Sequence, residues 1–580
     1  MIKIMKYLRK LDWLFLFLIA AFTVLQVYCT ITLTDAIKDL MNAIIGAYSG
    51  AKGEKDIWLG ALAMVGFATA SMACQCVSAL FASLISASLV TNLRKMLNDK
   101  VSEMSMSQIE AFSTSSLITR ATNDVQQVGF TFVMASRMLL SAPTTAIWAI
   151  CKIQAVSGEL TLLTAGGIVL LLLFLILMFI FLLPRFKIVQ KLIDKVNLIA
   201  QENLSGIRVI RAYNAESYQE GKFSKANVDL TRIQVFTSRL SALMNPVLTI
   251  IMNLLSLGIY WLGATLINGQ VTDYATLTGF STLASMIIMA FMMLMFMFIM
   301  IPRAEISANR INEVLDSKSE IAEPMIETPL KEKGTIEFSD VSFHYGDASE
   351  EVVSHISFKV NRGETLAIIG ATGSGKSTIL RLAARFYDVS EGSIKIDGVD
   401  VRQLKEKTLR KVLSIVPQKG LLFSGSVKSN IAFGNPGIDE EKIHNAARIA
   451  MAEEFILGLN GGYNAPIARG GSNVSGGQKQ RLCIARAIAT DPEICLFDDS
   501  FSALDFKTDL QVRKNLREAL GETTKIIVAQ RIGTIMDAEN IIVLHEGKIV
   551  GQGKHKELLN SCEEYRDIAL SQLSKEELGL

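Results

Sequence analysis

The sequence has few of the residues from which metal centres and disulfide scaffolds are built. It contains five histidines and seven cysteines among 580 residues, and the odd number of cysteines has no metal-site spacing. Cys74 and Cys76 lie in an apolar helical segment, where side chains two residues apart do not face each other. We therefore interpret the cysteines as packing residues of the core or the membrane.

An excess of charge of one sign is also missing. Lysine and arginine total 58, and aspartate and glutamate total 56, which gives a formal net charge of +2. No basic patch with interleaved aromatic residues appears along the sequence. The composition therefore gives no indication of a nucleic-acid partner.

Hydrophobic residues are abundant, at 50% of the chain, and they are unevenly distributed. The long apolar runs lie in 1–305, which indicates a transmembrane domain. Residues 335–580 alternate short apolar strands with helical stretches, the pattern of a soluble α/β domain. Between them, 306–334 is charged and contains Pro324 and Pro329, so it is predicted to be the linker.

Six apolar segments in the first half are long enough, at about 20 residues, to span a bilayer as helices. They lie near 13–33, 57–90, 132–151, 160–183, 244–267 and 277–301. The first follows a basic start, as in a signal peptide, but its apolar run is too long and no small-residue cleavage site follows. Segment 184–243 is rich in lysine and arginine and 268–276 has none, so we expect a multi-pass protein of the cytoplasmic (inner) membrane with both termini and the α/β domain in the cytoplasm.

The segment Gly370–Thr378, GATGSGKST, fits the phosphate-loop pattern G-x-x-x-x-G-K-[ST]. A triphosphate needs converging backbone N–H groups, so the loop must approach it without side chains, while Lys376 supplies a mobile positive charge and Ser377 a magnesium ligand. The apolar run before the loop and the helical spacing after it give the expected context. ATP and Mg²⁺ are the predicted cofactors, and the predicted phosphate-loop contacts are Gly370, Thr372, Gly373, Ser374, Gly375, Lys376, Ser377 and Thr378.

A second motif, Ser475-Gly476-Gly477-Gln478, follows further along the chain. With it, the chain resembles an ATP-binding-cassette (ABC) exporter half-transporter over nearly its whole length. In that family two cassettes enclose two ATP molecules, each bound by the phosphate loop of one cassette and the signature motif of the other. The resemblance implies that these four residues contact the ATP of a partner, a second ABC half-transporter.

The same resemblance assigns roles to single residues. Tyr345 would stack on adenine, and Gln418 would bind magnesium and communicate with the membrane helices. Asp498 would hold magnesium together with Ser377 and Gln418, and Asp505 would face the partner cassette.

The resemblance also implies the fold and two docking segments. The fold is a membrane all-α six-helix domain of the exporter type (the type IV ABC fold), followed by an α/β P-loop ATPase domain. Segments 112–128 and 202–223 are similar to the family's intracellular loops, where short coupling helices dock on the cassettes.

Two residues depart from the family pattern. Asp499 replaces the glutamate that orients and deprotonates the attacking water, and Gln530 replaces the histidine that contacts the γ-phosphate. A base must lie within about 2.6–3.2 Å of the proton it takes, so a carboxylate shorter by one methylene misplaces the water. Glutamine donates a hydrogen bond but does not titrate near neutral pH. The pair is similar to the degenerate site of a heterodimeric bacterial exporter; the alternative is neutral drift with full activity.

The sixth span is unusually rich in methionine. Because methionine is flexible and polarizable, a surface made of it can repack around different apolar ligands, although lipid-facing or helix-packing methionine explains the composition equally well. Arg137 in the third span would be costly against lipid and is expected near the cytoplasmic end or in a wet cavity. The methionines are Met286, Met289, Met292, Met293, Met295, Met297 and Met300.

Three functions remain open at this stage. The first is ATP-driven export of hydrophobic compounds, either drugs or lipid-like molecules, by a heterodimer that contains this chain. The second is peptide export, although only about a dozen residues precede the first span, too few for an N-terminal cysteine peptidase. The third is a mainly regulatory subunit that binds ATP and hydrolyses little of it.

Overall fold

The computed structural model describes residues 2–48, 53–154, 158–268, 273–346, 348, 350–435 and 437–578. The chain divides into two compact units, which we describe separately. One consists of Met1–Lys100 with Ser115–Ser317, and the other of Val101–Thr114 with Lys318–Leu580. A short piece of the first half therefore belongs to the unit formed by the second half.

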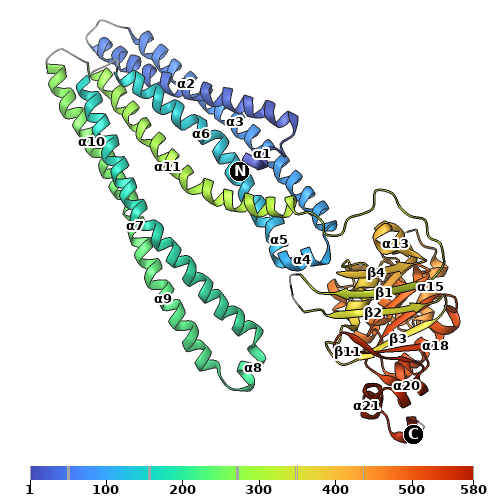
Figure 1. The fold of residues 1–580 in the computed structure, drawn as a ribbon. Helices are drawn as coiled ribbons and strands as arrows, with labels where there is room; N and C mark the ends of the chain where they lie inside the picture. Colours follow the sequence, from blue (N-terminus) through green and yellow to red (C-terminus); the bar gives the residue numbers. More distant parts are fainter. Residues whose placement is uncertain are drawn as a thin grey trace. The chain divides into compact units, whose positions relative to one another are not determined.

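The described residues of the first unit contain six helical stretches that are long and apolar enough to cross a membrane (Figure 1). This confirms the predicted number of spans. The stretches are Lys10–Tyr48, Glu54–Ser102, Thr114–Gln154, Gly158–Ser205, Glu216–Asn268 and Tyr274–Asp316. Each is longer than its predicted span, because hydropathy detects only the apolar part and misses the charged turns that continue the same helix.

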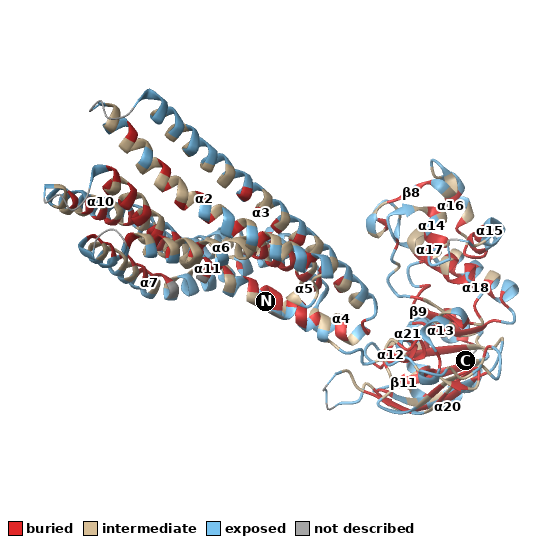
Figure 2. Cartoon of the chain, turned by 90° about the horizontal axis from the view of Figure 1, so that it is seen from above, coloured by how far each residue is buried: buried red, intermediate tan, exposed pale blue. Residues whose placement is uncertain are grey.

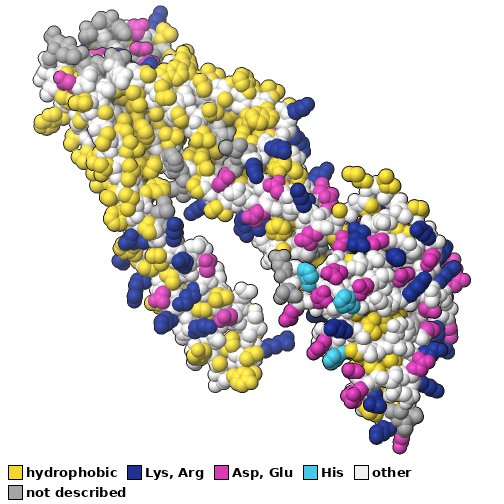
Figure 3. All heavy atoms as spheres, in the orientation of Figure 1, with side chains coloured by type: hydrophobic (Ala, Val, Ile, Leu, Met, Phe, Trp, Pro, Cys, Tyr) yellow, Lys and Arg dark blue, Asp and Glu magenta, His cyan; other side chains and the backbone are white. Residues whose placement is uncertain are grey.

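Packing within this unit pairs helices that are distant in sequence. The helix α11 (Tyr274–Asp316) lies along α6 (Val125–Gln154) and α2 (Lys10–Tyr48), while α7 (Gly158–Ser205) lies along α9 (Glu216–Ala242) and α10 (Met244–Asn268). A buried apolar cluster joins α2, α6, α7, α10 and α11. Many other apolar side chains point outward, as expected of helices in lipid (Figures 2 and 3).

Polar and charged side chains connect the turn before α6 to α11, outside the apolar parts of the two helices. The chain enters α6 through a π-helical turn, η1 (Arg120–Asp124). Arg120 Nη1 donates to Glu313 Oε2 at 2.9 Å, and Ser307 Oγ donates to Asp124 Oδ1 at 2.8 Å. These contacts give the buried side chains of Arg120 and Asp124 polar partners. Arg137 is half-buried in α6, and its predicted surroundings stay a prediction.

The second unit is built on a six-stranded sheet of order β12-β11-β3-β10-β9-β6. The strands β11, β3, β10, β9 and β6 are parallel, and β12 is the antiparallel edge. Along β3, Leu366 and Ile368 enter one apolar core while Ala367 and Ile369 enter the other, as expected of a strand covered on both faces. The bounds are β3 Thr365–Gly370, β6 Leu413–Val416, β9 Ile494–Asp498, β10 Thr524–Val528, β11 Asn540–His545 and β12 Lys548–Gly553.

A second, antiparallel sheet of order β2-β1-β4-β5 covers one of these cores. Its strands are β1 Ile336–Phe343, β2 Val353–Val360, β4 Glu391–Ile396 and β5 Val399–Asp400. The helices that matter below are α12 (Lys376–Ala383), α17 (Gly476–Ala489), α18 (Phe506–Ala519), α19 (Ile532–Ile535) and α21 (Glu563–Gln572).

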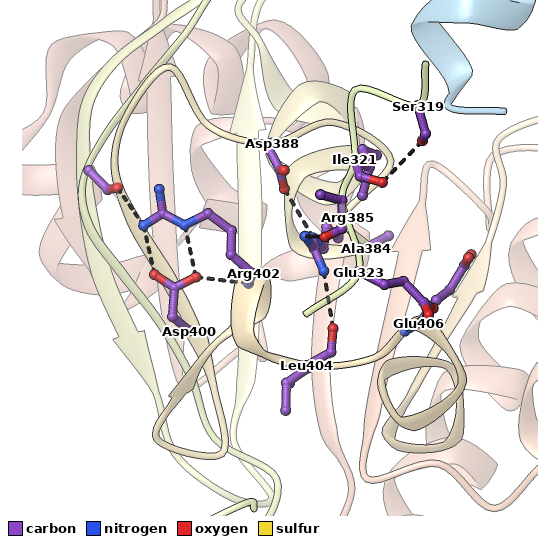
Figure 4. A network of polar contacts seen from close by, with 12 residues as sticks. Ser319, Ile321, Glu323, Ala384, Arg385, Asp388, Asp400, Arg402, Leu404 and Glu406 are labelled. Carbon is purple, nitrogen blue, oxygen red and sulfur yellow. Dashed lines mark hydrogen bonds and ion pairs between the residues drawn. The ribbon is translucent and has the colours of Figure 1, made fainter. Parts of the chain in front are cut away.

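The segment after α11 has no helix or strand until β1, and it is fastened to the second unit. Within the predicted linker the helix α11 continues to Asp316. Arg385 donates to the carbonyl of Leu404 at 3.1 Å (Figure 4). It also donates to the carbonyl of Ala322 at 3.0 Å, so the arginine binds the linker to the second unit. The short helix α4 (Met106–Phe112) also belongs here, because Gln108 donates to the carbonyl of Lys318 at 2.7 Å.

Candidate functional site

A pocket of about 320 Å³ lies where the parallel strands end. Because β3, β9 and β10 run in the same direction, their carboxyl ends meet at one edge of the sheet. The pocket brings together most residues predicted from the sequence and adds three that the prediction missed. It is lined by Tyr345, Val352, Thr372, Gly373, Gly375, Lys376, Ser377, Thr378, Arg381, Gln418, Asp498, Asp499, Val528 and Gln530.

The phosphate loop runs from the end of β3 into α12 and needs glycine at defined places. Gly375 has φ +94°, and a Cβ there would lie 2.6 Å from Val353 Cγ1. Gly373 has φ +86° and open space around its Cα. The left-handed backbone at both positions turns the chain without a side chain between the loop and the pocket. Of the other predicted contacts, Gly370 and Ser374 do not line the pocket.

Lys376 is the cation of this loop. Its Nζ donates to the carbonyl oxygens of Gly370 at 2.9 Å and Ala371 at 2.7 Å, which holds the ammonium group inside the curve of the loop. Burial lowers the pKa of Lys376, while the nearby carboxylates of Asp499 and Asp498 act in the opposite direction. The group is therefore a partly desolvated cation in the position that a phosphate needs.

Ser377 and Asp498 form the part of the pocket suited to a magnesium ion. Ser377 Oγ donates to Asp498 Oδ1 at 2.7 Å. Burial raises the pKa of Asp498, and the hydrogen bond from Ser377 opposes that effect. A hydroxyl and a carboxylate oxygen are hard ligands, and Mg²⁺ is usually held by one or two such groups together with substrate phosphates. The donor set therefore fits Mg²⁺ bound with ATP.

Asp499 is placed beside both glutamines of the pocket. Its Oδ2 accepts a hydrogen bond from Gln418 Nε2 at 3.3 Å and another from Gln530 Nε2 at 3.2 Å. The residue is 8% exposed and has a left-handed backbone with φ +44°, and its N–H donates to the carbonyl of Val528 at 2.9 Å. The sequence identified the three side chains one by one, but their meeting on a single oxygen is visible only in the structure.

The aromatic side of the pocket is formed by Tyr345. Its hydroxyl lies 3.1 Å from Thr378 Oγ1 and accepts a hydrogen bond from Arg381 Nη1 at 3.3 Å. The rings of Phe343 and Tyr387 meet the Tyr345 ring edge-on, at centroid distances of 4.8 Å and 5.2 Å. The sequence prediction missed Arg381, although it lies four residues after Ser377 and so shares its helix face.

The second motif lies outside this pocket. Ser475 is the N-cap of α17 and forms a capping box with Gln478, in which Gln478 N donates to Ser475 Oγ at 3.3 Å. Ser475 and Gly476 are exposed, and a Cβ on Gly476 would meet nothing within 4 Å. Asp505 is also exposed and caps α18 through a hydrogen bond from Thr508 N. These residues present an open helix N-terminus, the kind of surface that attracts an anion.

A parallel-stranded domain with a phosphate loop, joined to six membrane helices, defines a membrane protein with its own ATPase. Two family models match the chain: the ABC transporter transmembrane region over 12–291, and the ABC transporter over 353–502. The chain belongs to the ABC transporter family, as an exporter half-transporter in which the membrane domain is fused to the ATPase domain.

Relatives and a solved structure agree with this assignment. An uncharacterised ABC transporter ATP-binding protein of Mycobacterium tuberculosis is 34% identical over 564 residues, which cover 96% of each chain. An ATP-dependent lipid A-core flippase of Saccharophagus degradans is 32% identical, covering 85% of this chain and 83% of the flippase. The solved structure of a bacterial Atm1-family ABC exporter with ATP bound has a TM-score of 0.78 and 25% identity, covering 94% of this chain and 96% of that one. The predicted fold class and the ATPase are thereby confirmed.

Proposed function

We propose that this chain exports hydrophobic, drug-like or lipid-like compounds as one half of a heterodimer, in which its own ATP site binds nucleotide and hydrolyses it weakly. The observation that carries the proposal is Asp499, whose Oδ2 accepts hydrogen bonds from both Gln418 and Gln530. The intact phosphate loop and the Ser377–Asp498 pair support ATP and Mg²⁺ binding at the same site.

The geometry of Asp499 argues against efficient water activation. A general base needs a free lone pair within about 2.6–3.2 Å of the water proton that it takes. Here the shorter carboxylate has one oxygen occupied by two amide groups, and Gln530 has no titrating group with which to assist. Asp499 and Gln530, the two departures from the family pattern, therefore both affect the activation of the attacking water.

Two exposed surfaces support the need for a partner. The signature residues Ser475 and Gly476 lie outside the chain's own pocket and are exposed. At the tip of the hairpin formed by α7 and α9, the short helix α8 (Ile207–Ala212) exposes Ile207 and Val209 beside two arginines, and basic side chains continue along the hairpin (Figure 3). In our proposal the signature completes the partner's ATP site and α8 docks on a cassette.

The methionines of α11 and the relatives support a hydrophobic substrate. Met289, Met293 and Phe296 are exposed and follow one another at spacings of four and three residues, so they share one face of the helix. Met297 and Met300 are buried and serve packing. Several relatives are described as ATP-dependent lipid A-core flippases. We infer that the exposed face belongs to the translocation path.

The partnership is tested by the ATPase activity of the purified chain, alone and together with the half-transporter encoded by a neighbouring reading frame. We expect little turnover alone and restoration by a partner that has glutamate and histidine at the two changed positions. Vigorous turnover by the chain on its own would reject the heterodimer.

The substrate class is tested by transport in proteoliposomes with a fluorescent lipid and a cationic dye. The variant carrying Met289→Ala and Met293→Ala should lose transport of at least one of them, while ATP binding stays unchanged. Leu173→Ala on α7, where the side chain is 62% exposed, is the matched control. If the α11 variant and Leu173→Ala had equal effects on transport, we would conclude that the α11 face is not part of the translocation path.

A further inference from the structure

The loop that carries Gln530 is hydrogen-bonded to a residue from the other end of the domain. Gln572 Nε2 donates to the carbonyl oxygen of Gln530 at 2.8 Å, and the backbone N–H of Ile532 donates to Gln572 Oε1 at 2.8 Å. One side-chain amide therefore uses its donor on the loop between β10 and α19 and its acceptor on the first residue of α19. We call residues 529–531 the switch loop.

Gln572 is held in place by the helix that carries it. In α21, Tyr565 and Ala569 are fully buried, and Gln572 follows at the next position on the same helix face. Tyr565 OH lies 2.7 Å from His555 Nδ1, which ties α21 to α20 (His555–Ser561). The buried face of α21 fixes the position and rotation of the helix. The side-chain amide of Gln572 is therefore held next to the switch loop.

A connected set of hydrogen bonds leads from this amide into the ATP pocket. Gln572 fixes the backbone of Gln530, Gln530 Nε2 donates to Asp499 Oδ2 at 3.2 Å, and Gln418 Nε2 donates to the same oxygen. Both Gln530 and Asp499 line the pocket next to the Ser377–Asp498 pair. A displacement of the switch loop backbone would therefore move the Gln530 amide away from Asp499 and from the nucleotide.

We propose that Gln572 is a positioning residue of the ATP site, which holds the switch loop so that Gln530 can recognise the γ-phosphate. The inference rests on the proposed ATP site, in which Gln530 takes the place of the family histidine that contacts the γ-phosphate, and it does not depend on the heterodimer. It makes the C-terminal helix α21 part of the nucleotide-sensing machinery. Because Gln572 does not line the pocket, its effect on ATP is exerted through Gln530.

The test measures dissociation of a fluorescent non-hydrolysable ATP analogue and of the matching ADP analogue from the full-length chain with Mg²⁺. In Gln572→Met, dissociation of the ATP analogue should become about 3- to 10-fold faster, as expected for the loss of about one hydrogen bond. Dissociation of the ADP analogue should stay within about twofold of the original, because ADP has no γ-phosphate. A general weakening of the fold would speed up both.

Two further variants make the result specific. Gln572→Glu keeps the acceptor for Ile532 but places a carboxylate against the carbonyl of Gln530, so it should reproduce the ATP-specific effect. Ser571→Ala is the matched control, since Ser571 is exposed and its hydroxyl bonds only to the carbonyl of Ile568 in its own helix. Unfolding temperatures of all variants, measured in parallel, show whether each is folded.

A double-mutant comparison decides the outcome. In a Gln530→Ala background, Gln572→Met should change ATP-analogue dissociation by less than about 1.5-fold, because the side chain through which it acts is gone. Equal effects in the two backgrounds, or equal effects on ATP and ADP analogues, would overturn the proposal. Failure of the heterodimer proposal would instead appear as high turnover by the chain alone, so the two failures are distinguishable.

Discussion

The two sides of the nucleotide pocket differ in how their charged groups are used. On the phosphate-loop side, Lys376 lies within the loop and Ser377 donates to Asp498, so the cation and the metal ligands are positioned for ATP and Mg²⁺. On the opposite side, the carboxylate of Asp499 is occupied by the amides of Gln418 and Gln530. In the proposed function, binding and hydrolysis of ATP therefore depend on separate groups, which a sequence can change independently.

A transporter with split sites can use such a chain. In our proposal, the signature of this chain contacts the partner's ATP, while its own phosphate loop serves the altered site. Damage to the signature and damage to Asp499 should therefore differ greatly in size. The first and last of the four predictions below test that difference directly, and all four are given from the largest expected effect to the smallest.

The largest effect is expected at the signature. Gly477→Asp would direct a carboxylate toward the partner's triphosphate, and like charges in such contact cost several kcal/mol. ATPase activity of the heterodimer should fall by about 100-fold or more. Gly458→Asp is the matched control, because a Cβ at exposed Gly458 meets nothing within 4 Å. A Cβ at Gly477 lies 3.3 Å from the carbonyl of Ala503, so the unfolding temperature must be checked as well. Activity near that of the original would exclude a role for the signature at the active site.

The next effect is on binding at the phosphate-loop side. Lys376→Ala removes the one cation that the loop holds at its centre, and a charge-assisted hydrogen bond is worth about 1.5–3 kcal/mol. The affinity of this chain for Mg²⁺-ATP should fall by about 10- to 100-fold. Equilibrium binding of a fluorescent ATP analogue measures it, and Lys407→Ala at an exposed lysine is the control. An unchanged affinity would mean that the pocket does not bind the triphosphate as proposed.

Many residues on the two sides of the pocket could be predicted from the sequence, because the motifs that contain them are short and local. The phosphate loop was identified from its residue pattern after an apolar run, and Asp498 and Asp499 were identified from the resemblance to the family. The six spans were found because apolar runs of sufficient length have few alternatives. Their charged extensions, such as α11 up to Asp316, were not found, since hydropathy gives no signal there.

What the sequence could not provide depends on tertiary contact. Gln572 acts through backbone atoms of the switch loop, and an isolated glutamine near a helix end has no motif. The meeting of Gln418 and Gln530 on one oxygen of Asp499 requires the relative positions of three loops. The placement of α4 with the ATPase unit depends on hydrogen bonds such as that from Gln108 to Lys318 O.

Asp397 is a buried carboxylate outside the nucleotide pocket, and its surroundings can be compared with those of Asp499. Asp397 is fully buried; Thr335 N donates to its Oδ1 at 2.8 Å, but its Oδ2 has no hydrogen-bond partner among the described residues. Burial first, and then the carboxylate of Glu493, raise the pKa of Asp397 to about 6. Burial of Asp397 therefore disfavours its ionised form.

The third prediction follows from the raised pKa of Asp397. Because the folded state binds the proton of Asp397 more tightly than the unfolded state, the contribution of this group to stability is fully present below about pH 4 and is lost as the pH rises through about 6. Asp397→Asn keeps the group neutral, and asparagine tolerates its left-handed backbone, at φ +50°. At pH 8 the variant should be stabilised by about 1–3 kcal/mol, with a smaller gain at pH 5. The measurement is the temperature of the unfolding transition that ATP shifts; a loss of stability at pH 8 would contradict it.

The smallest effect is expected at Asp499 itself. A well-placed general base is worth about 10²–10⁴-fold in rate, but a carboxylate that is one methylene shorter and has one oxygen bonded to two amides has little of that to lose. In the heterodimer, Asp499→Asn should lower steady-state ATPase at saturating ATP by less than about threefold. The double variant Asp499→Glu with Gln530→His restores the family's residues and should raise turnover, whereas Gln530→His alone is the control that leaves the short carboxylate in place. If Asp499→Asn were as damaging as Gly477→Asp, this chain's own site would be the main site of hydrolysis, and the two sides of its pocket would have to be regarded as one intact catalytic unit.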